Sequence, residues 1–400
     1  MAVINQTDCF NFNIKFWKFL GIWPSTSFGH YYKYYSRVFV MTFQIFYNLL
    51  FSLNFYYLPR QLDIFIEETI FYFTEIAVMS KVLTFFFMHD KIVEIFIKLQ
   101  SDIFQPTNEY GVKVIENAVK FNVRYRKILA VVCFISSVAL LLTPIIAHLL
   151  MSVELVLPVC SYSFLSEEIK KNFIYPIYCY QCFGMFFHML YNMNIDIFFL
   201  GVLIFTIAQL DILAEKFRNI TDGHRFEETD ERNGNCRHIG NDDKELISRL
   251  NKAIVHYDEV SKFCELIQDT FSVTLFIQFS MASCIICICA FRFILPGSVQ
   301  YYIFLVTYTS VRIIQIMVPC WFGNRIMDKS YELCHALYCC KWTSKSRIFK
   351  SSVRIFMVRA CRPLTITGGK MFSLSLITFT SILQTAYSFF TLLCHMRNRL

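Results

Sequence analysis

Seven apolar runs divide this 400-residue chain, and each is long enough to cross the hydrocarbon core of a bilayer as a helix. The runs show no alternation with a period of two residues, and few glycines or prolines interrupt them, so they predict helices rather than the strands of a barrel. The expected fold class is therefore all-α, with seven transmembrane helices. The runs extend from Val38 to Leu58, Ile64 to Met88, Ile128 to Leu150, Pro176 to about Leu210, Thr270 to Phe293, Tyr301 to Phe322 and Met371 to Cys394.

Composition and motifs argue against a soluble enzyme. Hydrophobic residues make up 56% of the chain and charged residues only 17%, which is too apolar for one soluble core. The sequence contains no phosphate-binding loop, no zinc-binding His-Glu-x-x-His helix and no nucleophile elbow, so we expect no catalysis and no cofactor. The cysteines at 284, 287 and 289 lie in an apolar run and are interpreted as packing residues, so no metal site is expected.

The distribution of basic residues predicts the orientation in the membrane. Thirty of the 38 Lys and Arg residues fall in the N-terminal arm and in three loops on one side, and five fall on the other side. Cytoplasmic loops carry an excess of Lys and Arg, so the N-terminus is expected inside the cell and the C-terminus outside, an inverted topology. The net charge of +8 is then explained by an anionic lipid leaflet as partner, without nucleic acid.

This topology divides the chain into four parts. Residues 1–37 are expected to form a cytoplasmic N-terminal arm, and residues 38–322 six transmembrane helices with a ligand pocket in their outer halves. Residues 323–370 are basic and amphipathic, and they are expected to form cytoplasmic anchor helices that join subunits. Residues 371–400 are expected to form a seventh helix and a short extracellular tail. Polar residues such as Gln384 and Ser388 give this helix one face suited to water, as in a pore-lining segment.

The outer halves of the second, third, fourth and sixth runs are unusually aromatic. Aromatic walls with a few polar groups are typical of a pocket for a small apolar ligand. We therefore predict that a small volatile ligand contacts Phe71, Tyr72, Thr74, Thr143, Phe183, Phe187, His188, Phe304 and Tyr308.

Charged residues inside the apolar runs need partners, because an unpaired charge is unfavourable at bilayer depth. The second run contains Glu67, Glu68, Glu75 and Lys81, which neighbouring helices must shelter. Asp196 and Arg312 lie at depths that allow an ion pair between them. A disulfide between Cys160 and either Cys179 or Cys182 is left open, as both pairings fit the outer side.

The C-terminal seventy residues contain four short motifs. They are the segments Tyr338-Cys-Cys-Lys-Trp342, Arg362-Pro363-Leu364, Thr367-Gly368-Gly369 and Ser381 to Leu393, the last of which contains Ala386-Tyr387-Ser388. Together these segments resemble the signature of insect odorant receptors. The resemblance implies the odorant-tuning subunit of a heterotetrameric, ligand-gated, non-selective cation channel in the plasma membrane of sensory neurons. The partners implied are a volatile odorant and a shared co-receptor subunit, whose long intracellular insertion this chain lacks.

The resemblance also implies roles for residues near the end of the chain. The last helix lines the pore in that family, and by position Leu392, His395 and Met396 would stand at the gate. The cytoplasmic ends of the later helices join the subunits, which would place Tyr338, Trp342, Arg362 and Pro363 in the anchor. A gustatory receptor channel would share the fold but sense tastants. A secondary transporter would show internal repeats and broken helices, and neither is found in this sequence.

Overall fold

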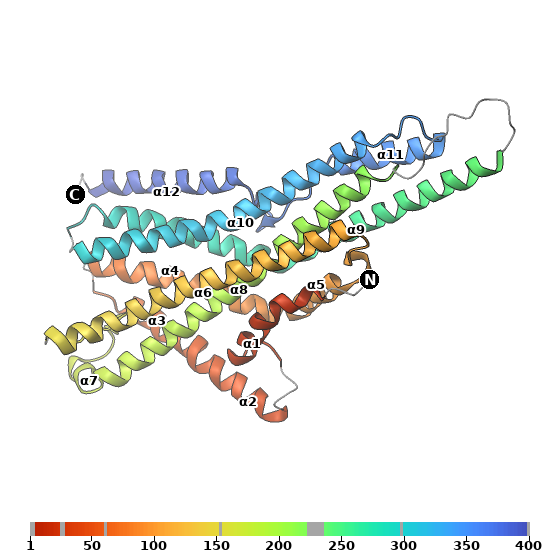
Figure 1. Ribbon diagram of the computed structural model, residues 1–400. Helices are drawn as coiled ribbons and strands as arrows, with labels where there is room; N and C mark the ends of the chain where they lie inside the picture. Colours follow the sequence, from red (N-terminus) through yellow and green to blue (C-terminus); the bar gives the residue numbers. More distant parts are fainter. Residues whose placement is uncertain are drawn as a thin grey trace.

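The computed structural model describes residues 5–24, 29–59, 62–151, 154–221, 236–296 and 299–397. It is an elongated helical bundle with the C-terminus at one end and α11 at the other (Figure 1). In chain order the elements are the 3₁₀ helix η1 (Gln6–Phe10), α1 (Asn11–Phe19), α2 (Gly29–Val40), the π-helical segment η2 (Met41–Phe46), α3 (Tyr47–Tyr56), α4 (Leu62–Phe87), α5 (His89–Gln100), the 3₁₀ helix η3 (Asp102–Phe104), α6 (Glu109–Met151), α7 (Glu167–Asn172), α8 (Ile174–Arg218), α9 (Cys236–Arg292), α10 (Val299–Cys339), α11 (Arg347–Ala360), the strands β1 (Thr367–Gly368) and β2 (Phe372–Ser373), and α12 (Leu376–Arg397).

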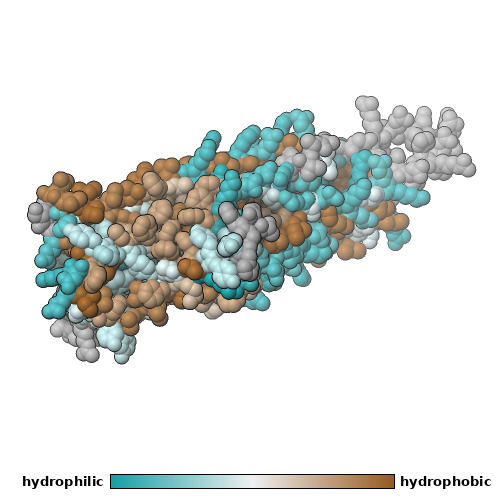
Figure 2. All heavy atoms as spheres, turned by 90° about the horizontal axis from the view of Figure 1, so that it is seen from below, coloured by the Kyte–Doolittle hydropathy of each residue, from teal (hydrophilic) through white to brown (hydrophobic). Residues whose placement is uncertain are grey.

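Seven helical segments in the described part of the chain are long and apolar enough to cross a membrane, and they correspond to the seven apolar runs of the sequence. The first combines α2, η2 and α3. Four of the helices are much longer than a bilayer requires. The longest, α9, has 57 residues and is therefore about 85 Å long at 1.5 Å per residue. These helices continue from an apolar half of the molecule into a mainly hydrophilic half, which Figure 2 shows on one face.

Helix α8 is the centre of the bundle. It packs against α4, α6, α9 and α10, and most of its residues beyond Leu190 are buried. The N-terminal arm packs against this core through α1. The Trp17 ring on α1 meets the Phe198 ring edge-on at 5.0 Å, and Asn13 Nδ2 donates to the Asn194 carbonyl oxygen at 2.9 Å. The first four residues, residues 222–235 and the last three residues lie outside the described part.

A short β-hairpin precedes the last helix, where the sequence predicts helix from Met371. Thr367 pairs with Ser373, and the backbone of Gly369 and Lys370 is left-handed, with φ of 59° and 58°. This turn breaks any helix, so α12 begins only at Leu376 and the predicted start of the run is wrong by five residues. The Gly369 amide donates to the Ser272 carbonyl oxygen at 2.8 Å, which ties the hairpin to α9.

A glycine allows the first membrane segment to approach α8. The ring of Tyr47 lies directly over Gly184, and a Cβ atom added to this glycine would overlap the ring carbons. Tyr47 itself is buried, so its ring has no free space into which to move. Close contact between α3 and α8 therefore depends on the absence of a side chain at this position.

We expect Gly184→Ala to destabilise the protein by about 1–3 kcal/mol through overpacking, although alanine is the better helix former. Thermal melting of detergent-purified protein, followed by size-exclusion chromatography, measures the change. Combining it with Tyr47→Ala should add little to the effect of Tyr47→Ala alone, because the smaller residue removes the clash. Additive effects of the two substitutions would contradict this account of the contact.

Candidate functional site

Four of the nine predicted ligand residues come together between α4 and α10. The Phe71 ring lies 6.2 Å from the Phe304 ring and 6.0 Å from the Tyr308 ring, and the last two rings are 5.6 Å apart. The hydroxyl groups of Thr74 and Tyr308 are hydrogen-bonded at 2.5 Å. All four side chains are partly buried. We call these four residues the α4–α10 cluster.

The other five predicted ligand residues lie elsewhere. Tyr72 faces α3, where its ring stacks on Phe55 at 4.6 Å. Thr143 is exposed on α6, and its hydroxyl donates to the Ala139 carbonyl oxygen of its own helix. Phe183 is exposed and stacks on Phe187. The Phe187 ring in turn packs against two phenylalanines of α2 and η2, Phe39 and Phe43.

His188 is buried, and both of its ring nitrogens face oxygen atoms of the protein. Nδ1 contacts the carboxylate of Glu75 on α4, and Nε2 lies 2.7 Å from the Phe43 carbonyl oxygen in η2. The Tyr47 ring covers it at 4.8 Å. This arrangement pairs Glu75, one of the charges in the second run, and holds α4, η2 and α8 together.

A polar network crosses the apolar half of the bundle between α4, α8 and α10. Lys81 is 1% exposed, and its Nζ atom donates to Asp196 Oδ1 at 2.5 Å and to Asn192 Oδ1 at 2.6 Å. Gln315 Nε2 donates to Asp196 Oδ2 at 2.8 Å, and Arg312 donates to Gln315 Oε1 at 2.8 Å. The carboxylate of Asp196 is therefore shared by Lys81 and Gln315.

This network corrects one expectation from the sequence. Asp196 and Arg312 form no direct ion pair in the described part of the chain, because Gln315 lies between them. Instead, Arg312 also donates to Thr74 Oγ1 and to the Tyr308 hydroxyl, both at 2.9 Å. The network and the α4–α10 cluster are thus continuous.

Of the remaining charges of the second run, Glu68 is buried as expected, and Glu67 is paired although its side chain is 41% exposed. Glu68 accepts hydrogen bonds from Asn54 and from the Ser161 hydroxyl, and Glu67 lies 3.4 Å from Arg292. Cys160, beside this site, is a free thiol, as are Cys179 and Cys182. Burial and the nearby Glu68 carboxylate raise the pKa of the Cys160 thiol well above its usual value, so it stays protonated.

Helix α12 is covered on one face only. Ala386 is its one buried residue, and its inner face touches α9 and α10. The opposite face presents polar side chains that line a shallow surface groove. The groove residues are Ser381, Gln384, Thr385, Ser388, Phe389, Thr391, Leu392 and His395. Two of the three predicted gate residues, Leu392 and His395, lie in this groove, and Met396 is exposed one helical turn beyond Leu392.

The predicted anchor residues gather at the hydrophilic end of α10. Tyr338 is 66% exposed, and its carbonyl oxygen accepts a hydrogen bond from Trp342 Nε1 at 3.3 Å. Arg362 is exposed and Pro363 half-buried in the segment after α11. Helix α11 itself presents large apolar side chains to its surroundings, namely Ile348, Ile355 and Val358.

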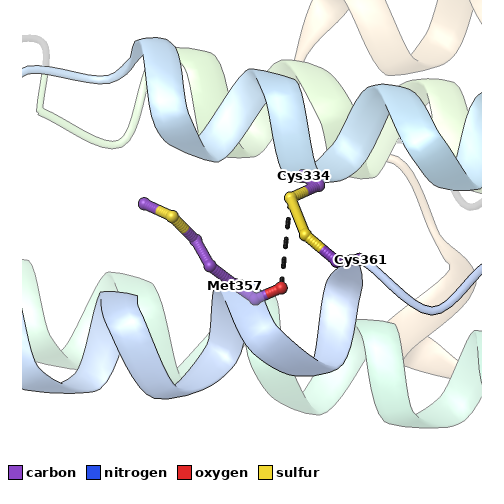
Figure 3. The surroundings of a disulfide bond; sticks show 3 residues. All are labelled: Cys334, Met357 and Cys361. Atoms are coloured by element: carbon purple, nitrogen blue, oxygen red, sulfur yellow. Dashed lines mark hydrogen bonds between the residues drawn. A yellow bond between two sulfur atoms is a disulfide. The ribbon is translucent and has the colours of Figure 1, made fainter.

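A disulfide joins Cys334 on α10 to Cys361 just after α11, a pairing not predicted from the sequence (Figure 3). The two Cα atoms are 5.5 Å apart. The Met357 carbonyl oxygen lies 3.9 Å from Cys334 Sγ, and it can accept a hydrogen bond only when that sulfur is a thiol. The two cysteines lie where the end of α11 packs on α10, in the region of the predicted anchor.

Comparison with known proteins decides the family. The family model for the 7tm Odorant receptor matches residues 61–387, which is most of the chain and far more than the C-terminal segments that carry the resemblance. This chain belongs to the odorant receptor family. With seven helices able to cross a bilayer, this member of the odorant receptor family is a multi-pass membrane protein.

Individual relatives support the same assignment. Odorant receptor 67c of Drosophila melanogaster is 29% identical over 153 residues, and the match covers 38% of each chain. The odorant receptor coreceptor of Anopheles gambiae is 24% identical over 168 residues, which is 42% of this chain and 35% of that one. The structure of the insect olfactory receptor OR5 from Machilis hrabei in complex with eugenol has the same fold. It matches with a TM-score of 0.79 and 17% identity, covering 96% of this chain and 97% of that one.

Two members of the polar network in this odorant receptor family member, Asn192 and Gln315, were not predicted from the sequence, although their spacing was visible. Asn192 and Asp196 are four residues apart, and Arg312 and Gln315 are three apart, so each pair occupies one helical face. Polar residues at such spacing inside apolar runs indicate a buried polar contact between helices. No comparable signal identified the partner helix.

Proposed function

We propose that this chain is the odorant-tuning subunit of a ligand-gated, non-selective cation channel that assembles with a shared co-receptor. The observation that carries the proposal is α12, a membrane-length helix with one buried residue and an exposed polar face. Polar side chains at bilayer depth are favourable only where they meet water or another protein. A ring of such helices around an aqueous pore satisfies this requirement, with Leu392, His395 and Met396 near its mouth.

The orientation follows from the basic residues, and it places the N-terminus in the cytoplasm and the C-terminus outside. In this orientation the α4–α10 cluster lies in the outer half of the membrane, and α11 with the end of α10 lies in the cytoplasm. The exposed apolar residues of α11 then support a role as part of the anchor between subunits, together with Tyr338, Trp342, Arg362 and Pro363. We place the channel in the plasma membrane of sensory neurons, in contact with lipid.

We propose the α4–α10 cluster as the odorant site. Its aromatic rings provide apolar surface, and its two hydroxyl groups can orient a small volatile ligand. A ligand opens the channel only if it binds the open state better than the closed state. Both α4 and α10 pack against α9, and α9 and α10 contact α12, so a shift at the cluster can reach the pore-facing helix.

Current recordings test the pocket. The chain is expressed with a co-receptor, a broad odorant panel identifies an agonist, and concentration–response curves are recorded for Phe304→Ala and Phe71→Ala. We expect each to raise the half-maximal concentration by about tenfold or more, because each removes a large ring from the site. Thr143→Ala is the matched control, since Thr143 is exposed and its hydroxyl donates to the Ala139 carbonyl oxygen of its own helix.

The result can contradict the proposal in two ways. Shifts for Phe304→Ala and Phe71→Ala no larger than that for Thr143→Ala, at equal surface levels, would place the ligand elsewhere. A surface-expressed wild-type channel that gives no current with any odorant of the panel would overturn the proposed function itself. Omitting the co-receptor should abolish the current.

A further inference from the structure

Arg312 is a cation whose partners in the described part of the chain are all neutral. Its guanidinium donates to Gln315 Oε1, Thr74 Oγ1 and the Tyr308 hydroxyl, and it lies 4.8 Å from the centre of the Tyr308 ring. Its buried Nε atom has no hydrogen-bond partner among the residues that the structure describes. Arg312 follows the start of α10 by thirteen residues, which is about 20 Å along the helix, so it stands at bilayer depth. An arginine in this setting is unfavourable without a further acceptor.

The neighbouring carboxylate does not supply this acceptor. Its Oδ1 accepts from Lys81 and its Oδ2 from Gln315, and Gln315 lies between this carboxylate and Arg312. Lys81 forms the ion pair with this carboxylate, with its Nζ atom 2.5 Å from Asp196 Oδ1. The network formed by Lys81, Asp196 and Arg312 therefore contains two cations and one anion.

The hydroxyl groups beside Arg312 are also fully used. Thr74 donates to the Ile70 carbonyl oxygen at 3.0 Å, so the Tyr308 hydroxyl must donate to Thr74 Oγ1, and both oxygens accept from Arg312. The free hydrogen-bonding capacity at this end of the α4–α10 cluster is thus a donor, the Arg312 N–H. A site of this kind favours a ligand with an acceptor oxygen over a ligand without one.

We infer that the ligand of the α4–α10 cluster is a small apolar molecule with an acceptor oxygen, and that Arg312 binds this oxygen. The class includes ketones, aldehydes, esters and carboxylic acids. The apolar part lies against Phe71 and Phe304, and Arg312, one helical turn beyond Tyr308, receives the oxygen. This inference rests on the proposed function, because it names the ligand class of the same site.

The test uses ligands that share one carbon skeleton: the alkane, the ketone, the methyl ester and the carboxylic acid. Currents are recorded from the full chain with its co-receptor. We expect the wild type to respond to the ketone, ester and acid at concentrations at least about tenfold lower than to the alkane, as for a hydrogen bond to a charged group. Arg312→Met should abolish this difference, so that the ketone, the ester and the acid need as high a concentration as the alkane. Arg325→Met, in the exposed hydrophilic part of α10, is the matched control and should keep the preference.

Equal responses of the wild type to the alkane and the ketone would overturn the inference and leave the proposed function standing. An unchanged preference in Arg312→Met would do the same. If Arg312→Met fails to reach the surface, Arg312→Lys keeps the charge but loses the planar guanidinium. That variant should weaken the ketone response more than the alkane response, and equal weakening would overturn the inference. No current with any ligand from a surface-expressed wild type would instead refute the proposed function.

Discussion

Replacing Lys81 with methionine is expected to remove most folded protein from the cell surface. Lys81 is buried, and its ammonium group is the charged partner of Asp196. Without it, the carboxylate keeps only the hydrogen bond from Gln315, so an uncompensated charge remains inside the bundle. Breaking a buried pair in this way costs about 3–5 kcal/mol, a large part of the 5–15 kcal/mol that keeps a typical protein folded. Surface biotinylation and thermal melting in detergent measure the loss.

The double variant Lys81→Met with Asp196→Leu measures the interaction energy between the two side chains, apart from the cost of losing either one alone. Removing both charges leaves no unpaired ion, so the double variant should be clearly more stable than the sum of the single effects predicts. Lys113→Met is the surface control, because the Lys113–Glu109 pair is largely exposed and should contribute almost nothing. If the two single effects simply add, the pair does not stabilise the bundle.

Gly323→Ala is expected to displace the entry to α12. A Cβ atom at Gly323 on α10 would lie 2.5 Å from the carbonyl oxygen of Leu374 and 3.0 Å from its carbonyl carbon. These are backbone atoms, so a rotamer change cannot relieve the clash, and either α10 or the segment leading into α12 must move. Because α12 carries the exposed polar face, we expect a loss of about 1–3 kcal/mol in stability together with a reduced or constitutive current.

The sign of the stability change in Gly323→Ala distinguishes a steric clash from a simple gain in helix propensity. In an open helical position, Gly→Ala stabilises by about 1 kcal/mol, so a destabilised Gly323→Ala protein must reflect the contact with Leu374. The neighbouring variant Asn324→Ala is the control, since the Asn324 amide donates to Asp328 of its own helix. A Gly323→Ala protein that melts higher than the wild type and conducts normally would show that the two segments do not meet in this way.

The bundle and the site differ in how far the sequence predicts them. The seven runs are visible because membrane insertion depends on length and hydrophobicity, which are local properties. The start of α12 is not visible in the sequence, because Met371 is apolar and continues the helical pattern. The two left-handed residues before it, however, form a turn that packs on α9. The N-terminal arm is likewise not separable by composition, although Trp17 is completely buried against α4 and α8.

For the candidate ligand residues, the sequence predicts the depth in the membrane but not which side chains meet. Depth along each helix follows from counting residues, so all nine were placed near one level. Which of them face one another depends on how each helix is rotated about its axis, and this is decided by long-range packing. Phe71, Phe304 and Tyr308 therefore meet, whereas Thr143 and Phe183 are exposed.

The sequence by itself determined the number of spans, the unequal distribution of charge and the motifs of the family, because each depends on residues close together in the chain. It also showed that buried charges need partners. Only the tertiary structure decided which residues those partners are. Lys81 pairs with Asp196, His188 contacts Glu75, and Gln315 lies between Asp196 and Arg312. The physical reason is that a hydrogen bond requires two groups within about 3 Å, and residues more than a hundred positions apart reach that distance only when the helices have packed.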